Sequence, residues 1–299
     1  MESFSRGWNF LKQAWGMAFK DKDLIKPSIY ALVVGGLVSV LGIIPIILVA
    51  LAAGNSDVGN VVMFVLGAIL LFVQFIISYI FSAMTVYLIY GYLSEGDGRM
   101  DKAWAIVKRD LFDIATLAAA STVVNLLKNA ANKNRKGIGA AVVRAGAGLL
   151  ETLWTEAALL VLPAMVIDDL NLKQGLERVW NITKNNFLLV GISTVGVKWV
   201  TGLIGFVLGI IGAVIGFAIG GGLAYVSGGE TAVSVVGIAI GVLIFFLFVV
   251  VASVISSYTS TAYHTCLYIW ARDVEIAREK GSTGQVSAPA PLAAVLGQS

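Results

Sequence analysis

The chain of 299 residues is poor in charge and in side chains that bind metals: 13% of its residues are Asp, Glu, Lys or Arg, and it has one cysteine and one histidine. The single cysteine, Cys266, excludes an intrachain disulfide and a cysteine-based zinc site. The single histidine, His264, cannot form a metal site without help from carboxylates, and no HExxH sequence occurs. We therefore expect no resident metal ion.

The signatures of common catalytic chemistries are also missing. The sequence has no Walker loop, no GxGxxG after a predicted strand and no GxSxG motif. Asp168 and Asp169 are adjacent at the end of a hydrophobic segment, where such a pair is usually a solvated cap or turn. Because every loop is too short to fold alone, we also expect no soluble domain. The sequence thus predicts a protein that is not an enzyme and has no cofactor.

Hydrophobic residues make up 58% of the chain, and its mean hydropathy is +0.87. Soluble domains are roughly 45–50% apolar and about 25% charged. The charges are absent from long runs, which predicts a multi-pass helical membrane protein. The net charge of +3 is then explained by the positive flanks of membrane segments, not by nucleic-acid binding. Residues 1–26 have no apolar core of the kind found in a cleavable signal peptide.

The pattern predicts an all-α, polytopic helical membrane bundle, with a single membrane domain at 1–275 and a disordered cytoplasmic tail at 276–299. We expect six hydrophobic segments, at 28–53, 61–93, 111–127, 138–163, 187–226 and 231–270. Three interfacial amphipathic helices are predicted at 4–20, 102–112 and 172–184. The predicted anchors at the membrane interface are Trp8, Trp15, Trp104, Trp180 and Trp270.

A three-fold helix-hairpin repeat is visible: Trp15, Trp104 and Trp180 each precede a polar corner and two hydrophobic segments. The repeat places the three amphipathic helices on one side, and the distribution of Lys and Arg predicts that both termini are cytoplasmic. We expect the protein in the bacterial cytoplasmic (inner) membrane. The basic turn at 132–137 conflicts with an outside location. In the alternative, 111–127 and 138–163 form a re-entrant hairpin that does not cross; six full spans are favoured.

Ionisable residues occur within the predicted spans. Two interpretations are open: a polar pathway for protons, ions or a small solute, or buried ion pairs that fix helix register. Lys198 is the predicted partner of Glu151 or Glu156, whereas an interhelical hydrogen bond is favoured for the histidine over a proton relay. The residues concerned are Arg144, Glu151, Thr155, Glu156, Lys198 and His264.

Glycines recur in the fifth hydrophobic segment, and small residues four apart let helix backbones approach closely. We expect helix packing, within the chain or in a homo-oligomer, with a gating hinge as the alternative. These glycines are Gly205, Gly209, Gly212, Gly216 and Gly220.

A family resemblance covers roughly residues 5–275. It is carried by the run KDKDLIKPS at 20–28 and by the run from Pro163 to Trp180, with Asp168 or Asp169, Leu176 and Arg178 between them. The chain resembles an uncharacterised prokaryotic family of six-helix integral membrane proteins. It is also distantly similar to the membrane domain of bacterial glycerophosphodiester phosphodiesterases, although Val179 stands where serine is more common. The resemblance implies a six-helix, all-α membrane domain and transfers no catalytic residue.

The sequence leaves the function open between several classes. A scaffold or assembly role in the membrane comes first. The alternative is a channel or transporter with a polar path around Arg144, Glu151, Glu156 and Lys198, and lipid handling is a weaker third. The expected partners are the lipid bilayer and a second copy or another membrane protein, with no nucleic acid. Solvated charges favour transport, whereas charges paired with one another favour the scaffold.

Overall fold

The computed structural model describes the chain except residues 1, 54–55, 133–137, 227–230, 282–285 and 297–299. The side chains of 2–4, 138–140, 183, 185–199, 224, 226 and 231–234 are also outside the description. The described elements are helices: α1 (Glu2–Lys20), the short 3-10 helix η1 (Lys22–Leu24), α2 (Lys26–Ala53), α3 (Asp57–Glu95), α4 (Met100–Arg109), α5 (Leu111–Asn132), α6 (Ile138–Asp168), α7 (Leu172–Val226), α8 (Thr231–Glu279) and α9 (Ala290–Leu296).

The predicted all-α fold is confirmed. Six of the described helices, α2, α3, α5, α6, α7 and α8, are long and apolar enough to cross a membrane. Even α5, with 22 residues, is about 33 Å long, which exceeds a hydrocarbon core of about 30 Å. The protein is therefore a multi-pass helical membrane protein by length and composition.

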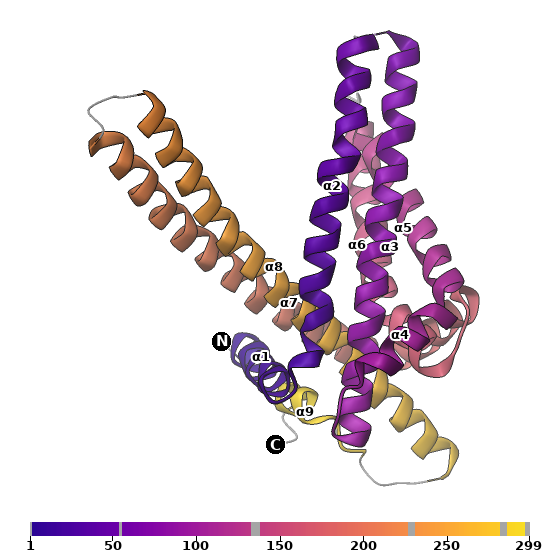
Figure 1. The fold of residues 1–299 in the computed structure, drawn as a ribbon. Coiled ribbons are helices and arrows are strands. Elements are labelled where there is room, and N and C mark those ends of the chain that lie inside the picture. Colours follow the sequence, from indigo (N-terminus) through magenta and orange to yellow (C-terminus); the bar gives the residue numbers. More distant parts are fainter. Residues whose placement is uncertain (1, 54–55, 133–137, 227–230, 282–285, 297–299) are drawn as a thin grey trace.

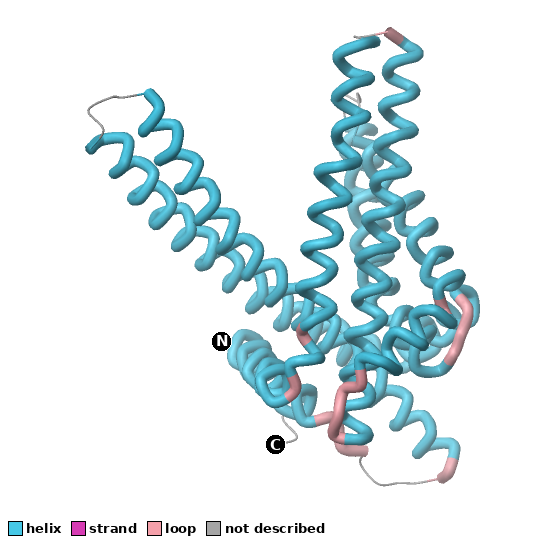
Figure 2. The backbone as a smooth tube through the Cα atoms, viewed as in Figure 1, coloured by secondary structure: helices cyan, strands magenta, loops and turns pink. Residues whose placement is uncertain are grey.

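The six helices form three hairpins, α2–α3, α5–α6 and α7–α8 (Figure 1). The first two hairpins stand together, because α3 contacts both α5 and α6. The outer part of the α7–α8 hairpin leans away from them, so the molecule is V-shaped (Figure 1). We call the end where α1, α4, α9 and the corners between hairpins gather the base (Figure 2).

The buried core lies toward the base, where α1, α3, α6 and α8 meet; examples of its fully buried side chains are Phe10, Met84, Leu88 and Tyr263. Away from the base the helices are mostly exposed. Only 6% of the most apolar stretch of α2 is buried within the chain, and the same holds for α3. Apolar surface of this extent is suited to contact with lipid tails.

The third amphipathic helix, predicted at 172–184, is not a separate element. It is the first part of α7, whose 55 residues span roughly 80 Å. Residues 172–226 contain no proline, so no backbone N–H is lost and the helical hydrogen bonds can continue through the polar residues at 184–186. The other two predicted helices are separate, as α1 and α4.

The predicted disordered tail is wrong for its described parts. α8 continues to Glu279, and α9 packs on α1 with Leu292 and Val295 buried. The indole N–H of Trp270 donates to the carbonyl oxygen of Val286 at 3.3 Å. A seven-residue helix without charges is too short to show a clear period, so composition alone suggested disorder where tertiary contacts give order.

Candidate functional site: paired charges between the membrane helices

Glu151 on α6 forms an ion pair with Lys128 on α5, with 2.5 Å between Oε2 and Nζ. Thr155, one turn further along α6, donates its hydroxyl to the backbone carbonyl of Glu151 at 2.8 Å. The sequence predicts Lys198 as the partner of Glu151 or Glu156, but the side chain of Lys198 lies outside the described residues. The observed pair joins the two helices of one hairpin.

Arg144 lies on an exposed stretch of α6, seven residues before Glu151, which is about 10 Å along the helix. Glu156 follows Glu151 by five residues, in the direction away from Arg144, and contacts a different helix, α8. Arg144, Glu151 and Glu156 are therefore distributed along α6, and the two glutamates contact different helices.

Glu156 contacts His264 of α8, with 3.3 Å between the carboxylate Oε2 and the imidazole Nε2. The other ring nitrogen, Nδ1, lies 2.7 Å from the backbone carbonyl oxygen of Ser260, one turn earlier on α8. The His264 side chain is 3% exposed and that of Glu156 is 26% exposed. The ring of Tyr263 lies edge-on to the imidazole, with 5.2 Å between the ring centroids. The predicted hydrogen bond of His264 to another helix is thus observed.

The hydroxyl-rich stretch of α8 that contains His264 is buried against α1. The hydroxyl of Tyr258 donates to the carbonyl of Ala14 at 2.9 Å, and the indole N–H of Trp15 donates to the hydroxyl of Thr259 at 3.1 Å. Cys266 is fully buried in the same stretch. These polar groups are used inside the protein, which explains why so many hydroxyls are tolerated in an apolar helix.

The predicted tryptophan anchors have two kinds of environment. Trp8, Trp104 and Trp180 expose their side chains, as a residue in contact with the membrane interface does. Trp15 is half-buried and hydrogen-bonded, and Trp270 is buried with 8% of its surface exposed. Trp270 therefore packs inside the protein and is not an anchor toward lipid.

Asp168, at the end of α6, is a second centre of polar contacts. It accepts a hydrogen bond from the hydroxyl of Tyr268 and another, at 3.1 Å, from Nη1 of Arg272, both on α8. The guanidinium of Arg272 also lies over the ring of Tyr90 on α3, 5.5 Å from its centroid. One carboxylate thus connects α6 to α8, and through Arg272 to α3.

Arg109, at the end of α4, contacts both the start of α5 and the turn between α6 and α7. Its guanidinium pairs with Asp110 at 2.5 Å and with Asp169 at 3.1 Å, and it reaches the backbone carbonyl of Val166 at 3.4 Å. The hydrogen bond with Asp110 raises the pKa of Arg109 above its ordinary value, so this residue stays charged. Nearby, Arg178 in the first part of α7 forms an ion pair with Glu275 in the last part of α8.

We call these contacts at the base the basal polar cluster; its members are Tyr90, Arg109, Asp110, Asp168, Asp169, Arg178, Tyr268, Arg272 and Glu275. The sequence interpretation of Asp168–Asp169 as a solvated turn holds for Asp169, which is 67% exposed and has a φ of 55°. It is wrong for Asp168. The signal that points to the cluster is the spacing of Tyr268 and Arg272, which are one turn apart on the same face of α8.

Three of the five predicted packing glycines hold α7 against α8. A Cβ atom on Gly216 would lie 2.4 Å from the carbonyl oxygen of Gly241, and one on Gly220 would lie 2.8 Å from that of Gly237. A Cβ on Gly212 would meet Phe248 at 2.7 Å. By contrast, a Cβ on Gly205 or Gly209 would meet nothing within 4 Å. The glycines thus act in packing within the chain, and only over part of the stripe.

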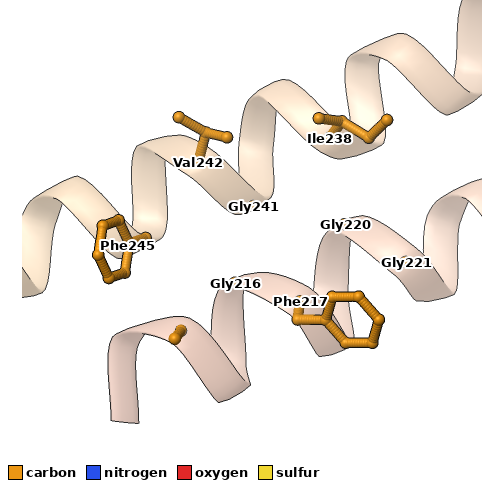
Figure 3. A pocket seen from close by; sticks show the side chains of 9 residues that line it. Gly216, Phe217, Gly220, Gly221, Ile238, Gly241, Val242 and Phe245 are labelled. Carbon is orange, nitrogen blue, oxygen red and sulfur yellow. The ribbon is translucent and has the colours of Figure 1, made fainter. Parts of the chain in front are cut away.

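Beside this close contact lies an apolar groove of about 470 Å³, shown in Figure 3. Its lining includes the glycines Gly216, Gly220 and Gly241 and the aromatic residues Phe217 and Phe245. It contains none of the ionisable residues named above. The groove is therefore separate from the paired charges.

Among the residues that the structure describes, no group of three or more His, Cys, Asp or Glu side chains is placed to hold a metal ion. No protein-family model matches the chain, and none of the curated proteins is significantly similar to it. The family resemblance drawn from Pro163 to Trp180 stays a prediction.

Proposed function

We propose that this protein is a non-enzymatic scaffold or assembly protein of the bacterial cytoplasmic membrane. The observation that carries the proposal is the pairing of its intramembrane charges. Glu151 binds Lys128 and Glu156 binds His264, each across two membrane helices. Charges used in this way fix which helices pack together and in which register.

The arrangement of the hairpins supports the same role. In the α7–α8 hairpin the two helices pack closely through glycines. The hairpin projects at an angle from the rest of the molecule, and apolar side chains such as Phe206 and Phe217 are exposed on it. The basal polar cluster joins this hairpin to the other two near the base. Such a molecule places separate apolar surfaces in the bilayer, where lipids, a second copy or another membrane protein can contact them.

The orientation that we propose has the base, with both termini, in the cytoplasm. The described residues at the base include Lys20, Lys22, Lys26, Arg99 and Lys108, close to the ends of the spans. Positive residues near the ends of membrane helices favour the cytoplasmic side.

A channel or transporter for a small solute or ion is the second candidate. One observation favours it: Glu156 and His264 are ionisable groups inside two membrane-spanning helices, and such groups often belong to ion or proton pathways.

Reconstitution into liposomes tests the proposal against the alternative. Purified full-length protein is incorporated into vesicles, and the fluxes of protons, potassium and sodium are followed with entrapped fluorescent indicators. The scaffold predicts fluxes equal to those of protein-free vesicles. A flux that depends on the protein, and that Glu156→Gln or Glu151→Gln abolishes while the variant still inserts, would overturn it in favour of transport.

A further inference from the structure

Glu156 and His264 have a geometry that fixes their protonation. The Nδ1 atom of His264 lies 2.7 Å from the carbonyl oxygen of Ser260. A backbone carbonyl oxygen only accepts hydrogen bonds, so Nδ1 carries a hydrogen. A neutral imidazole has one N–H, so its Nε2 would then be an acceptor with no hydrogen.

The Nε2 atom faces another acceptor. It lies 3.3 Å from Oε2 of Glu156, and an ionised carboxylate also only accepts. Two acceptors that face each other at this distance repel, and the repulsion is stronger in surroundings of low dielectric constant. We infer that Glu156 and His264 share one additional proton, which makes them a proton-binding site between α6 and α8.

The proton can reside on either atom. On Nε2 it gives an imidazolium beside a carboxylate; on Oε2 it gives a neutral imidazole beside a carboxylic acid that donates to it. Both forms hold the same number of protons, and both replace the repulsion by a hydrogen bond between the helices. The His264 side chain is buried, whereas that of Glu156 is one-quarter exposed, so Glu156 is the member of the pair nearer the surface of the chain.

The site links two parts of the molecule. Glu156 belongs to the α5–α6 hairpin, which stands beside α2–α3, and His264 belongs to α8, whose outer part leans away from both (Figure 1). The Asp168–Arg272 ion pair joins the same two helices, three turns further along α6 and two along α8. The shared proton is therefore a second, deeper attachment of α6 to α8. This inference is independent of the scaffold proposal, which is tested by flux.

The single histidine of the chain makes the test direct, because nitrogen-15 labelling of histidine yields the signals of His264 alone. The full-length protein is placed in lipid nanodiscs at neutral pH, and the protonation of both ring nitrogens is read by solid-state NMR. Infrared spectra of the same samples detect a carboxylic acid. We expect Nδ1 protonated, together with either a protonated Nε2 or a carboxylic acid band.

Two variants on the same helix complete the experiment. In Glu156→Gln the amide NH₂ can donate to Nε2, so the additional proton is no longer needed. We expect Nε2 to be unprotonated and any carboxylic acid band to disappear. Glu151→Gln is the matched control, because Glu151 binds Lys128 and not the histidine, and its spectra should equal those of the unchanged protein.

Two results in the unchanged protein would overturn the inference. One is an unprotonated Nδ1; the other is an unprotonated Nε2 together with no carboxylic acid band. The spectra of the unchanged protein suffice for this decision if Glu156→Gln does not fold.

Discussion

Asp168 accepts hydrogen bonds from two side chains of α8, Tyr268 and Arg272, while its neighbour Asp169 points to a more exposed contact with Arg109. Arg272 is mostly buried, and its Nε has no hydrogen-bond partner. Its charge therefore depends on the remaining contacts, of which Asp168 is the closest. The two adjacent carboxylates therefore differ in their contacts, because the side chain of Asp168 is turned into the protein and that of Asp169 is not.

Asp168→Asn should lower the free energy of unfolding by about 2 kcal/mol, because it leaves a mostly buried guanidinium without its nearest carboxylate. Asp169→Asn is the matched control, with an expected loss below about 0.5 kcal/mol, since its ion pair is exposed and asparagine tolerates a positive φ. Both values are measured by denaturant unfolding in mixed micelles. Equal losses in the two variants would contradict the role given to Asp168.

The sequence shows that ionisable residues lie in the membrane segments, because each stands out in an apolar run. It does not show their partners. The hydrophobic segment predicted there ends at residue 127, yet α5 extends to Asn132 and brings Lys128 beside Glu151. Partner choice depends on how far each helix continues and how neighbouring helices rotate, and neither is encoded in the spacing along one segment.

The α7–α8 hairpin is the element whose packing is most specific. The helices approach so closely at Gly216 and Gly241 that a Cβ on either would collide with the carbonyl oxygen of the other, at 2.4 and 2.3 Å. The glycine period of four predicts close packing. It does not predict where the contact ends: a Cβ on Gly205 or Gly209 would meet nothing within 4 Å.

Gly216→Ala should destabilise the protein by about 1–3 kcal/mol, as overpacking of a closed contact does. Gly209→Ala, which adds the same methyl group where nothing lies within 4 Å, should be neutral or slightly stabilising. The measurement is again denaturant unfolding in mixed micelles. If Gly209→Ala destabilised the protein as much as Gly216→Ala, the glycine face of α7 would pack differently from the structure described.

The tail is the element on which sequence and structure differ most. Leu292 is fully buried against the cluster that includes Phe10 of α1, whereas Ala290 is exposed. The short helix α9 is ordered by this contact, since seven residues do not form a stable helix alone in water.

Leu292→Asp should therefore release α9, because a carboxylate would enter an apolar site. Hydrogen exchange of residues 286–296 should become faster by at least about tenfold, which corresponds to a loss of about 1.4 kcal/mol in local stability. Ala290→Asp should leave the exchange unchanged. Unchanged exchange in Leu292→Asp would show that α9 is held by other contacts.

The whole molecule is three hairpins whose corners and termini gather at one end. Composition predicts the membrane class and the number of spans because apolar length is a strong signal. The angle between the hairpins is absent from the sequence pattern, because it depends on contacts between residues far apart in the sequence, such as those of Asp168 with Tyr268 and Arg272. For the proposed function, all six helices cross the bilayer and the base lies in the cytoplasm.

Thiol labelling from outside the cell tests this claim most directly. In a Cys266→Ala background, a single cysteine replaces Asn132 at the far end of α5 or Asp97 at the base, both of which are exposed. A membrane-impermeant reagent is added to spheroplasts before and after lysis. We predict that the cysteine at 132 is labelled in intact spheroplasts and the one at 97 only after lysis. Labelling at 132 only after lysis would contradict the account, because α5 and α6 would then form a re-entrant hairpin that enters and leaves on the cytoplasmic side.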